Sequence, residues 1–362
     1  MSQPAPVISQ HFSTAEQRGM ELALQAAGQG VRGANPLVGA VIIDSRGEVL
    51  STGYHRGAGT PHAEVDALAN VPSGRETELA DCTMLVTLEP CNHRGRTGPC
   101  SGAILEAGIG SLVFAAADPT DQAAGGAQRL AAAGVAVRTG LMPQQAQELN
   151  HRWFQARREG RPFTTLHIAQ TMDGLIAAAD GSSQWITGEE ARADSHGIRS
   201  RADAIIAGNG TIAADNPRLT ARDRAGAETP DQPLRVVMGR RKVPADAAVR
   251  GADGLFLQLA THDPAEVLAE LAGRGIGHAM IEGGATIASA FLRADLIDEL
   301  VLYLAPLMLG AGTRAVADLG IGTLAEAGRW RWDSAGGSAR TLGADLRLHL
   351  EPLPFRGTQK GN

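Results

Sequence analysis

The chain has 362 residues, a length that suggests two domains of roughly 100–200 residues each. Hydrophobic residues make up 43% and charged residues 20%, which is typical of a globular protein and not of a disordered one. The net charge of −6 and the aromatic share of 4% argue against nucleic acid as a partner, because proteins that bind nucleic acid present basic faces and stacking aromatics.

Targeting signals and disulfides are also not indicated. No apolar run approaches the roughly 18 residues of a membrane span, and the first residues lack the basic and apolar pattern of a secretory signal. We therefore expect a cytoplasmic protein with no membrane partner. An odd count of three cysteines does not make a disulfide framework, and all three lie close together, at Cys82, Cys91 and Cys100.

Helix and strand signals alternate through the first half. Ser13-Thr14-Ala15-Glu16 is a capping box that predicts a helix running toward Gly28. An apolar run followed by the turn Asp44-Ser45-Arg46-Gly47 predicts a hairpin that ends near His55. Strands are expected at 84–88, 111–115 and 135–137, and helices are expected to start at Pro61-His62 and Pro99-Cys100 and to cover 128–133 and 144–158. This alternation predicts an α/β fold with a largely parallel sheet.

The charged, Gly- and Pro-containing segment 157–162 is the strongest boundary signal in the chain. It divides the sequence into predicted domains 1–157 and 158–362. The alternation then resumes, with strands expected at 163–169, 204–207, 234–238, 279–281 and 300–304 and a helix at 189–201, whereas 221–232 and 240–253 resemble loops.

The strongest chemical signal is His62-Ala63-Glu64 followed by Pro90-Cys91 and by Cys100. Two thiolates and one imidazole are a typical ligand set for catalytic zinc, which keeps a fourth position open for a water of lowered pKa. Glu64 is the expected non-ligand residue that moves a proton from this water to a leaving amine. Cys82 lies outside the pattern and is expected in the core.

Alternatives to an open zinc site remain. The zinc-deaminase signature has two residues between its cysteines, whereas eight separate Cys91 from Cys100 here. A closed structural site would need a fourth ligand, which His93 could supply, and two inert buried cysteines are a further alternative.

The second half carries glycine-rich turns. The G-x-G-x-x-A match at 208–213 is a weak dinucleotide signal, and Asn216-Pro217 ends the following helix too early for a Rossmann unit. Glu282-Gly283-Gly284 follows a predicted strand, where its backbone amides either bind a phosphate or form an ordinary tight turn. Trp185, among small polar residues, is either a core residue or one that stacks on a cofactor.

These motifs together resemble the bifunctional deaminase–reductase family of riboflavin biosynthesis. The resemblance rests on the motif at 35–39, His62-Ala63-Glu64, the segment 90–100 with its eight-residue cysteine spacing, and, in the same order as in the family, 173–174, 183–187, 208–211, 214–220 and 282–284. It implies an N-terminal cytidine-deaminase-like α/β/α domain with Zn²⁺ and a C-terminal dihydrofolate-reductase-like α/β domain that uses NADPH.

The resemblance also implies an activity and a set of site residues. The first domain would hydrolytically deaminate 2,5-diamino-6-(5-phosphoribosylamino)pyrimidin-4(3H)-one, and the second would reduce the ribosyl to the ribityl chain, in a homo-oligomer. Zinc would be bound by His62, Cys91 and Cys100, with Glu64 catalytic. The cofactor would contact Ala169, Trp185, Thr211, Asp215, Gly284, Ala285 and Thr286, and the substrates would contact Asn35, His55, Ser183, Arg199, Leu219, Arg222 and Glu282.

The sequence departs from the family pattern at three positions. Gly98 stands where the family usually has Pro, His167 where it usually has Lys, and Arg240 where Ser is frequent. An active deaminase with an impaired or altered reductase is therefore an alternative, and a nucleoside or RNA-base deaminase is another.

Overall fold

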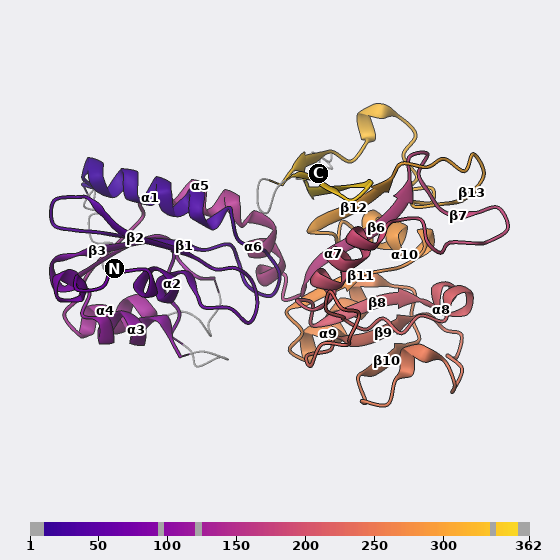
Figure 1. Ribbon diagram of the computed structural model, residues 1–362, viewed down its shortest axis with the longest axis horizontal. Helices are drawn as coiled ribbons and strands as arrows, with labels where there is room; N and C mark the ends of the chain where they lie inside the picture. The colour runs from indigo at the N-terminus through magenta and orange to yellow at the C-terminus, as the bar shows by residue number, and fades with distance from the viewer. Residues whose placement is uncertain (1–10, 93–97, 120–124, 334–337, 354–362) are drawn as a thin grey trace, which may run out of the picture. The chain divides into compact units, whose positions relative to one another are not determined.

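The computed structural model describes residues 11–92, 98–119, 125–333 and 338–353. The chain is divided into two compact units. The first unit consists of Met1–Arg32 and Pro36–Phe154, and the second consists of Gly33–Asn35 and Gln155–Asn362. Each unit has its own sheet and its own buried core (Figure 1). Among the described residues, no helix combines the length and apolar character that crossing a membrane requires.

A five-stranded sheet forms the centre of the first unit, in the order β2-β1-β3-β4-β5. β1 is antiparallel to β2 and β3, which confirms the predicted hairpin, and β3, β4 and β5 are parallel. The strands span Gly39–Ile43 (β1), Val49–Tyr54 (β2), Thr83–Leu88 (β3), Ser111–Ala116 (β4) and Ala136–Thr139 (β5).

Helices cover both faces of this sheet. Buried apolar residues of α2, α3 and α4 pack on one face, and α1 lies against the other, where a Cβ at Gly39 would come within 2.0 Å of the Ala23 carbonyl oxygen. The predicted capping box is confirmed, since Ser13 and Glu16 bond each other's backbone N–H groups. The helices span Thr14–Ala27 (α1), Ala63–Ala69 (α2), Cys100–Ala107 (α3), Gly126–Ala132 (α4) and Pro143–Leu149 (α5), with a 3-10 turn at Glu76–Asp81 (η1).

The single helix predicted over 144–158 is wrong, because the chain forms two helices, α5 and α6 (His151–Arg158), that are separated at Asn150. The buried Asn150 side chain accepts from the Leu37 N–H and donates to the Leu37 carbonyl, both at 2.8 Å. A contact 113 residues away in the sequence thus interrupts a locally continuous helix pattern.

The second unit contains a nine-stranded sheet in the order β10-β9-β8-β11-β6-β12-β16-β14, with β15 paired to β16. The strands from β10 to β12 in this order are parallel, and β14, β15 and β16 are antiparallel to their neighbours. The strands span Phe163–Thr171 (β6), Ala204–Gly208 (β8), Leu234–Met238 (β9), Phe256–Leu259 (β10), His278–Ile281 (β11), Glu299–Ala305 (β12), Trp330–Trp332 (β14), Ala339–Leu342 (β15) and Asp345–Pro352 (β16). β7 (Leu175–Ala178) and β13 (Gly312–Arg314) form a separate pair.

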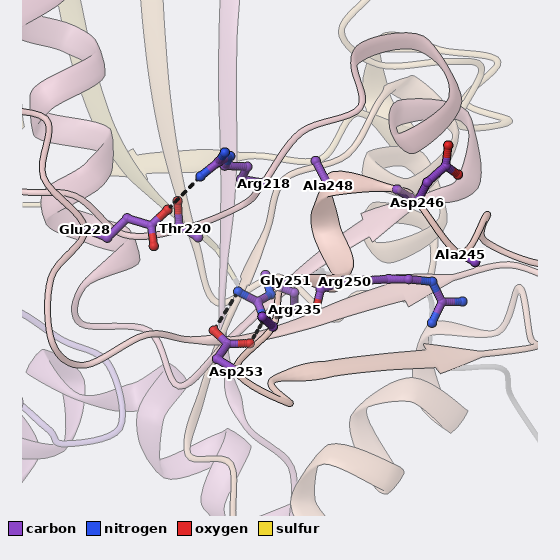
Figure 2. Close-up of a pocket in the computed structure, with 12 residues that line it drawn as sticks. Arg218, Thr220, Glu228, Arg235, Ala245, Asp246, Ala248, Arg250, Gly251 and Asp253 are labelled. Atoms are coloured by element: carbon purple, nitrogen blue, oxygen red, sulfur yellow. Dashed lines mark hydrogen bonds and ion pairs between the residues drawn. The ribbon is translucent and has the colours of Figure 1, made fainter.

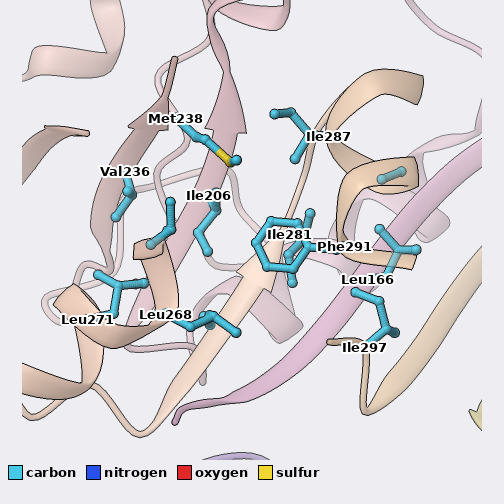
Figure 3. Close-up of a cluster of buried hydrophobic side chains, with 14 of the residues drawn as sticks. Leu166, Ile206, Val236, Met238, Leu268, Leu271, Ile281, Ile287, Phe291 and Ile297 are labelled. Atoms are coloured by element: carbon cyan, nitrogen blue, oxygen red, sulfur yellow. The ribbon is translucent and has the colours of Figure 1, made fainter. Parts of the chain in front are cut away.

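Two apolar cores lie on the two faces of this sheet. Figure 3 shows the core in which α9 and α10 side chains, including Leu268, Leu271 and Phe291, pack on β8, β9 and β11. Residues of α7 pack on the opposite face. The helices span Glu189–Arg199 (α7), Asn209–Asp215 (α8), Pro264–Gly273 (α9) and Ala285–Arg293 (α10), with 3-10 turns at Ala248–Arg250 (η2) and Leu324–Glu326 (η3). The α/β class predicted from the sequence is confirmed in both units.

A chain of buried polar side chains crosses the second sheet. His278 Nε2 lies 2.7 Å from Thr165 Oγ1, which donates to Glu299 Oε1 at 2.6 Å. Glu299 Oε2 lies 2.8 Å from His349 Nε2, and Asp333 Oδ2 lies 3.5 Å from the same nitrogen. Burial lowers the pKa of His349, but the Glu299 and Asp333 carboxylates outweigh burial and raise the pKa above its ordinary value. These carboxylates therefore favour the charged form of the imidazole.

This charge predicts a pH dependence of stability. A group with a raised folded pKa contributes stability that is complete below its unfolded pKa of about 6.5 and is lost as the pH rises through the folded pKa. We expect the unfolding free energy of the wild type, followed by tryptophan fluorescence in urea, to fall as the pH rises above about 6.5. His349→Gln keeps a donor but has no charge to lose, so this fall should be absent. An equal fall in both proteins would contradict the assignment.

Candidate functional site

Three segments of the first unit bring His62, Cys91 and Cys100 together. His62 is the N-cap of α2, Cys100 is the first residue of α3, and Cys91 follows β3. His62 Nδ1 lies 3.2 Å from Cys100 Sγ and 3.6 Å from Cys91 Sγ. All three ligand atoms lie within 4.8 Å of one another. One nitrogen and two sulfur atoms at this separation fit the donor set and size of a zinc ion.

The carboxyl group of Glu64 lies in the first turn of α2 and is only 3% exposed. Burial raises its pKa above the ordinary value. A carboxyl group with a raised pKa accepts and returns a proton more readily near neutral pH than an exposed one does. Glu64 thus has the properties of a proton carrier beside the three ligand atoms.

His55 joins the same cluster. Its ring meets the His62 ring edge-on at a centroid distance of 5.3 Å, and its Nδ1 lies 3.0 Å from the Pro61 carbonyl oxygen. Burial lowers the pKa of His55, so the ring is neutral. Because the Pro61 contact requires Nδ1 to donate, Nε2 is the acceptor of this ring.

The thiol groups of Cys91 and Cys100 differ from the thiol of Cys82 in their surroundings and contacts. Hydrogen bonds from the Cys100 and His62 side chains lower the pKa of Cys91, which favours the thiolate that metal binding requires. Cys82 donates to the Glu78 carbonyl and packs in the apolar core of the first unit, as the sequence predicts. Its thiol has no part in the cluster.

The structure does not place two of the residues predicted for this site, His93 and Asn35, next to the three ligand atoms. His93, the alternative fourth ligand, lies outside the described residues, as do the other positions of 93–97. Asn35 falls in Gly33–Asn35, a segment that groups with the second unit, and its role in substrate binding stays a prediction.

In the second unit, Arg199 and Glu282 form a two-pronged ion pair. Arg199 Nε and Nη2 lie 2.6 and 2.5 Å from the two carboxylate oxygens, and Nη1 donates to the Thr220 carbonyl at 3.2 Å. Burial raises the pKa of Glu282, but the charge of Arg199 outweighs burial and lowers it. Both side chains belong to the predicted substrate set, as do Leu219 and Arg222 on either side of Thr220.

Five of the seven predicted cofactor residues lie on α8 or at the start of α10, the helices that follow β8 and β11. Gly284 is the N-cap residue of α10, and its backbone N–H donates to Thr211 Oγ1 of α8 at 3.2 Å. Asp215, the last residue of α8, accepts from Ser183 at 3.0 Å. Ala285 and Thr286 form the first turn of α10, and Ala169 lies on β6. The early end of α8 at Asp215 confirms the rejection of a Rossmann unit.

Trp185 is not a core residue, because 68% of its surface is exposed. The Arg192 guanidinium lies 4.6 Å from its ring centroid. The core alternative for Trp185 is therefore wrong, and one face of an aromatic ring is left accessible at this position.

His167 is half-buried, and its Nε2 lies 2.9 Å from Ser195 Oγ. Burial lowers its pKa, so this position carries no cation near neutral pH. His167 faces α7 on β6, next to the strand that leads into Glu282. Arg240 is exposed just after β9.

A cavity of about 660 Å³ borders the Thr220 loop (Figure 2). Four of its charged side chains pair with each other: Arg235 with Asp253, and Arg218 with Glu228 at 3.5 Å. Arg250 donates to the carbonyls of Val243 and Pro244. No sequence motif pointed to this cavity, since most of the residues that line it come from the segment 240–253, which was expected to be a loop.

A second group of potential metal ligands, Glu299, Asp333 and His349, is present among the described residues. All three are buried. The Glu299 and Asp333 carboxylates raise the pKa of His349, which favours a protonated ring over one that binds a metal. Sequence reasoning missed this group, since the three residues come from β12, β16 and the end of β14, and no local motif joins them.

Comparisons with known proteins agree with this geometry. Residues 13–116 match the cytidine and deoxycytidylate deaminase zinc-binding region, and residues 162–336 match the RibD C-terminal domain. The riboflavin biosynthesis protein RibD of Mycobacterium tuberculosis is 42% identical over 344 residues, which cover 95% of this chain and 98% of the relative. The chain belongs to the RibD family. The expected cytidine-deaminase-like N-terminal domain and the resemblance to riboflavin biosynthesis enzymes are thereby confirmed.

Other RibD proteins extend this similarity. RibD of Corynebacterium ammoniagenes is 46% identical over 316 residues, covering 86% of this chain and 90% of the relative. The solved structure of Acinetobacter baumannii RibD is 34% identical, with a TM-score of 0.71 over 94% of this chain and 99% of that one. A Thermotoga maritima structure described as a diaminohydroxyphosphoribosylaminopyrimidine deaminase/5-amino-6-(5-phosphoribosylamino)uracil reductase is 26% identical, covers 94% of this chain and 99% of that one, and has a TM-score of 0.67.

Proposed function

We propose that this chain is a bifunctional enzyme of riboflavin biosynthesis, with a zinc-dependent deaminase in residues 1–157 and an NADPH-dependent reductase in residues 158–362. The observation that supports it most is the convergence of His62, Cys91 and Cys100 next to the buried carboxyl of Glu64. Family membership over both halves supports the second activity. The substrate is the diamino-pyrimidine that carries a phosphoribosylamino group.

His62, Cys91 and Cys100 would hold zinc, whose chemistry is to act as a Lewis acid that lowers the pKa of water. Glu64 takes the proton of the attacking water and passes it to the exocyclic nitrogen at C2. The C–N bond then breaks, ammonia leaves, and the carbon keeps the oxygen. The raised pKa of Glu64 suits a group that must both accept and donate. His55, neutral and fixed by Pro61, would orient the pyrimidine, and Asn35 would be a further substrate contact.

In the reductase, hydride chemistry comes from NADPH, so the protein must position both molecules. The Gly284 turn, with Thr211, would bind the dinucleotide at the N-terminus of α10, where backbone N–H groups favour phosphate. Asp215, Trp185, Ala169, Ala285 and Thr286 would complete its site. Arg199, Glu282, Ser183, Leu219 and Arg222 would hold the phosphorylated substrate.

A second candidate is an active deaminase joined to a reductase of altered substrate or rate. It is favoured by His167, which is half-buried, has a lowered pKa and is bonded to Ser195 beside the predicted substrate pair. The expected homo-oligomer and cytoplasmic location remain predictions.

Glu64→Gln tests the deaminase. The amide keeps the shape of the side chain but cannot accept a proton, so we expect deamination to fall by about 10²- to 10⁴-fold. Zinc content should stay at the wild-type level, and NADPH oxidation with the deaminated substrate should not change. Normal deamination by a folded, zinc-loaded variant would contradict the proposal.

Glu282→Gln tests the reductase. The amide is similar in size, but it loses the charge that accepts from Arg199 and the substrate. We expect the KM for the deaminated substrate to rise about 10- to 100-fold, because a hydrogen bond to a charged group contributes about 1.5–3 kcal/mol. The KM for NADPH should change little. Arg274→Ala, which removes an exposed ion pair with Glu270, is the matched control. Absence of NADPH oxidation by the wild type would favour the second candidate.

A further inference from the structure

The two cysteine-bearing segments are joined directly by their backbones. The Ser101 N–H donates to the Cys91 carbonyl at 3.1 Å. The Cys100 N–H donates to Cys91 Sγ at 3.4 Å, across nine positions of sequence. These bonds set the two segments side by side without involving the metal.

Side chains add a second connection at the next position of each segment. Ser101 Oγ, on the fully buried residue after Cys100, donates to Asn92 Oδ1 at 2.9 Å. Arg129 Nη1 donates to the same Asn92 oxygen at 3.1 Å and lies 3.4 Å from Ser101 Oγ. One carboxamide oxygen therefore receives donors from both α3 and α4.

The helix that carries Arg129 is itself fixed against the Cys91 segment. Glu89 Oε1 accepts from the N–H groups of Gly125 and Ala127, both at 3.2 Å, at the start of α4. A Cβ at Gly126 would lie 1.8 Å from the Pro90 carbonyl oxygen, so the helix start touches the backbone that leads into Cys91. The helix α4, from which Arg129 extends to Asn92, is therefore held in place by contacts of its own with the Cys91 segment.

We propose that Asn92, Ser101 and Arg129 form a clip that positions the two cysteines for zinc. The clip rests on the zinc site of the proposed function. It acts through the residue that follows each cysteine and touches neither substrate nor metal, so its members are positioning residues. Groups that orient metal ligands in this way typically change metal affinity about 10- to 100-fold when they are removed.

The clip differs from an ordinary stabilising contact in its expected effects. Arg129 is exposed and Asn92 is half-buried, so the net contribution of their hydrogen bond to folding is small. Most of the effect should therefore fall on the geometry of the thiolates and on zinc retention, with a small change in the stability of the zinc-free protein.

Two variants of Asn92 test whether the hydrogen-bond acceptor Oδ1 matters or only the size of the side chain. Asn92→Leu has a similar size but no acceptor, and we expect the zinc affinity, measured by competition with a chromophoric chelator, to fall about 10- to 100-fold. Asn92→Asp keeps an oxygen for both donors, so its affinity should stay near the wild-type value. Arg129→Ala should give an intermediate loss, and combining it with Asn92→Leu should add little, because both changes remove the same bond.

Controls separate the outcomes. Arg75→Ala removes an ion pair with Glu78 elsewhere in the first unit and should leave zinc affinity unchanged. Wild-type protein with less than one zinc per chain would overturn the proposed zinc site itself. Wild-type protein with one zinc, and Asn92→Leu with wild-type affinity, would overturn the clip alone. A loss of affinity matched by an equal loss of stability in the zinc-free protein would also overturn it in favour of a structural role.

Discussion

Convergence of three separate chain segments within 4.8 Å is the constraint on which the first unit depends. Cys91 stands where β3 ends, and His62 and Cys100 stand where α2 and α3 begin. The start of each helix has to meet the carboxyl end of a strand, so both helices must pack closely on the sheet. Gly53 shows how close this packing is, because a Cβ there would lie 2.2 Å from the Ala67 backbone nitrogen of α2. The hairpin, the parallel strands and the helix caps together fix the positions of three ligand atoms.

In the second unit, too, the predicted site residues lie near the carboxyl ends of the strands of its own sheet. Glu282 follows β11, Thr211 lies on the helix that follows β8, and Arg199 ends the helix α7 that covers the sheet. Ligands of open parallel sheets bind at the carboxyl ends of the strands. Here the strand ends supply a carboxylate that is held by Arg199, and the Gly284 N–H at the start of α10 that is held by Thr211. The groups predicted to bind ligands are thus held in place by hydrogen bonds within the protein.

Local signals in the sequence predicted the parts of the fold that short-range chemistry decides. The Ser13–Glu16 capping box, the helix starts at Pro61-His62 and Pro99-Cys100, and the end of α8 before Asn216-Pro217 all depend on neighbouring residues. The break at Asn150 could not be predicted, because its cause is a bond to Leu37. The clip was missed for the same reason, since Arg129 lies 37 positions from Asn92. The strands β14 and β15 are too short, at three and four residues, to show a clear pattern, whereas the alternation of Leu346, Leu348 and Leu350 with polar residues in β16 was an available strand signal.

Both groups of potential metal ligands, His62, Cys91 and Cys100 in the first unit and Glu299, Asp333 and His349 in the second, bring negatively charged side chains together. The two groups differ in what compensates this charge. The Glu299 and Asp333 carboxylates of the second unit raise the pKa of His349, which favours a positive charge on the imidazole between them. A single proton is small and cannot hold two sulfur atoms and a nitrogen in a fixed geometry. Thiolates prefer softer metal ions, and a divalent cation offsets both of their charges at once. The chemical identity of the donors, and not the distance between them, therefore distinguishes a metal site from a proton site in this chain.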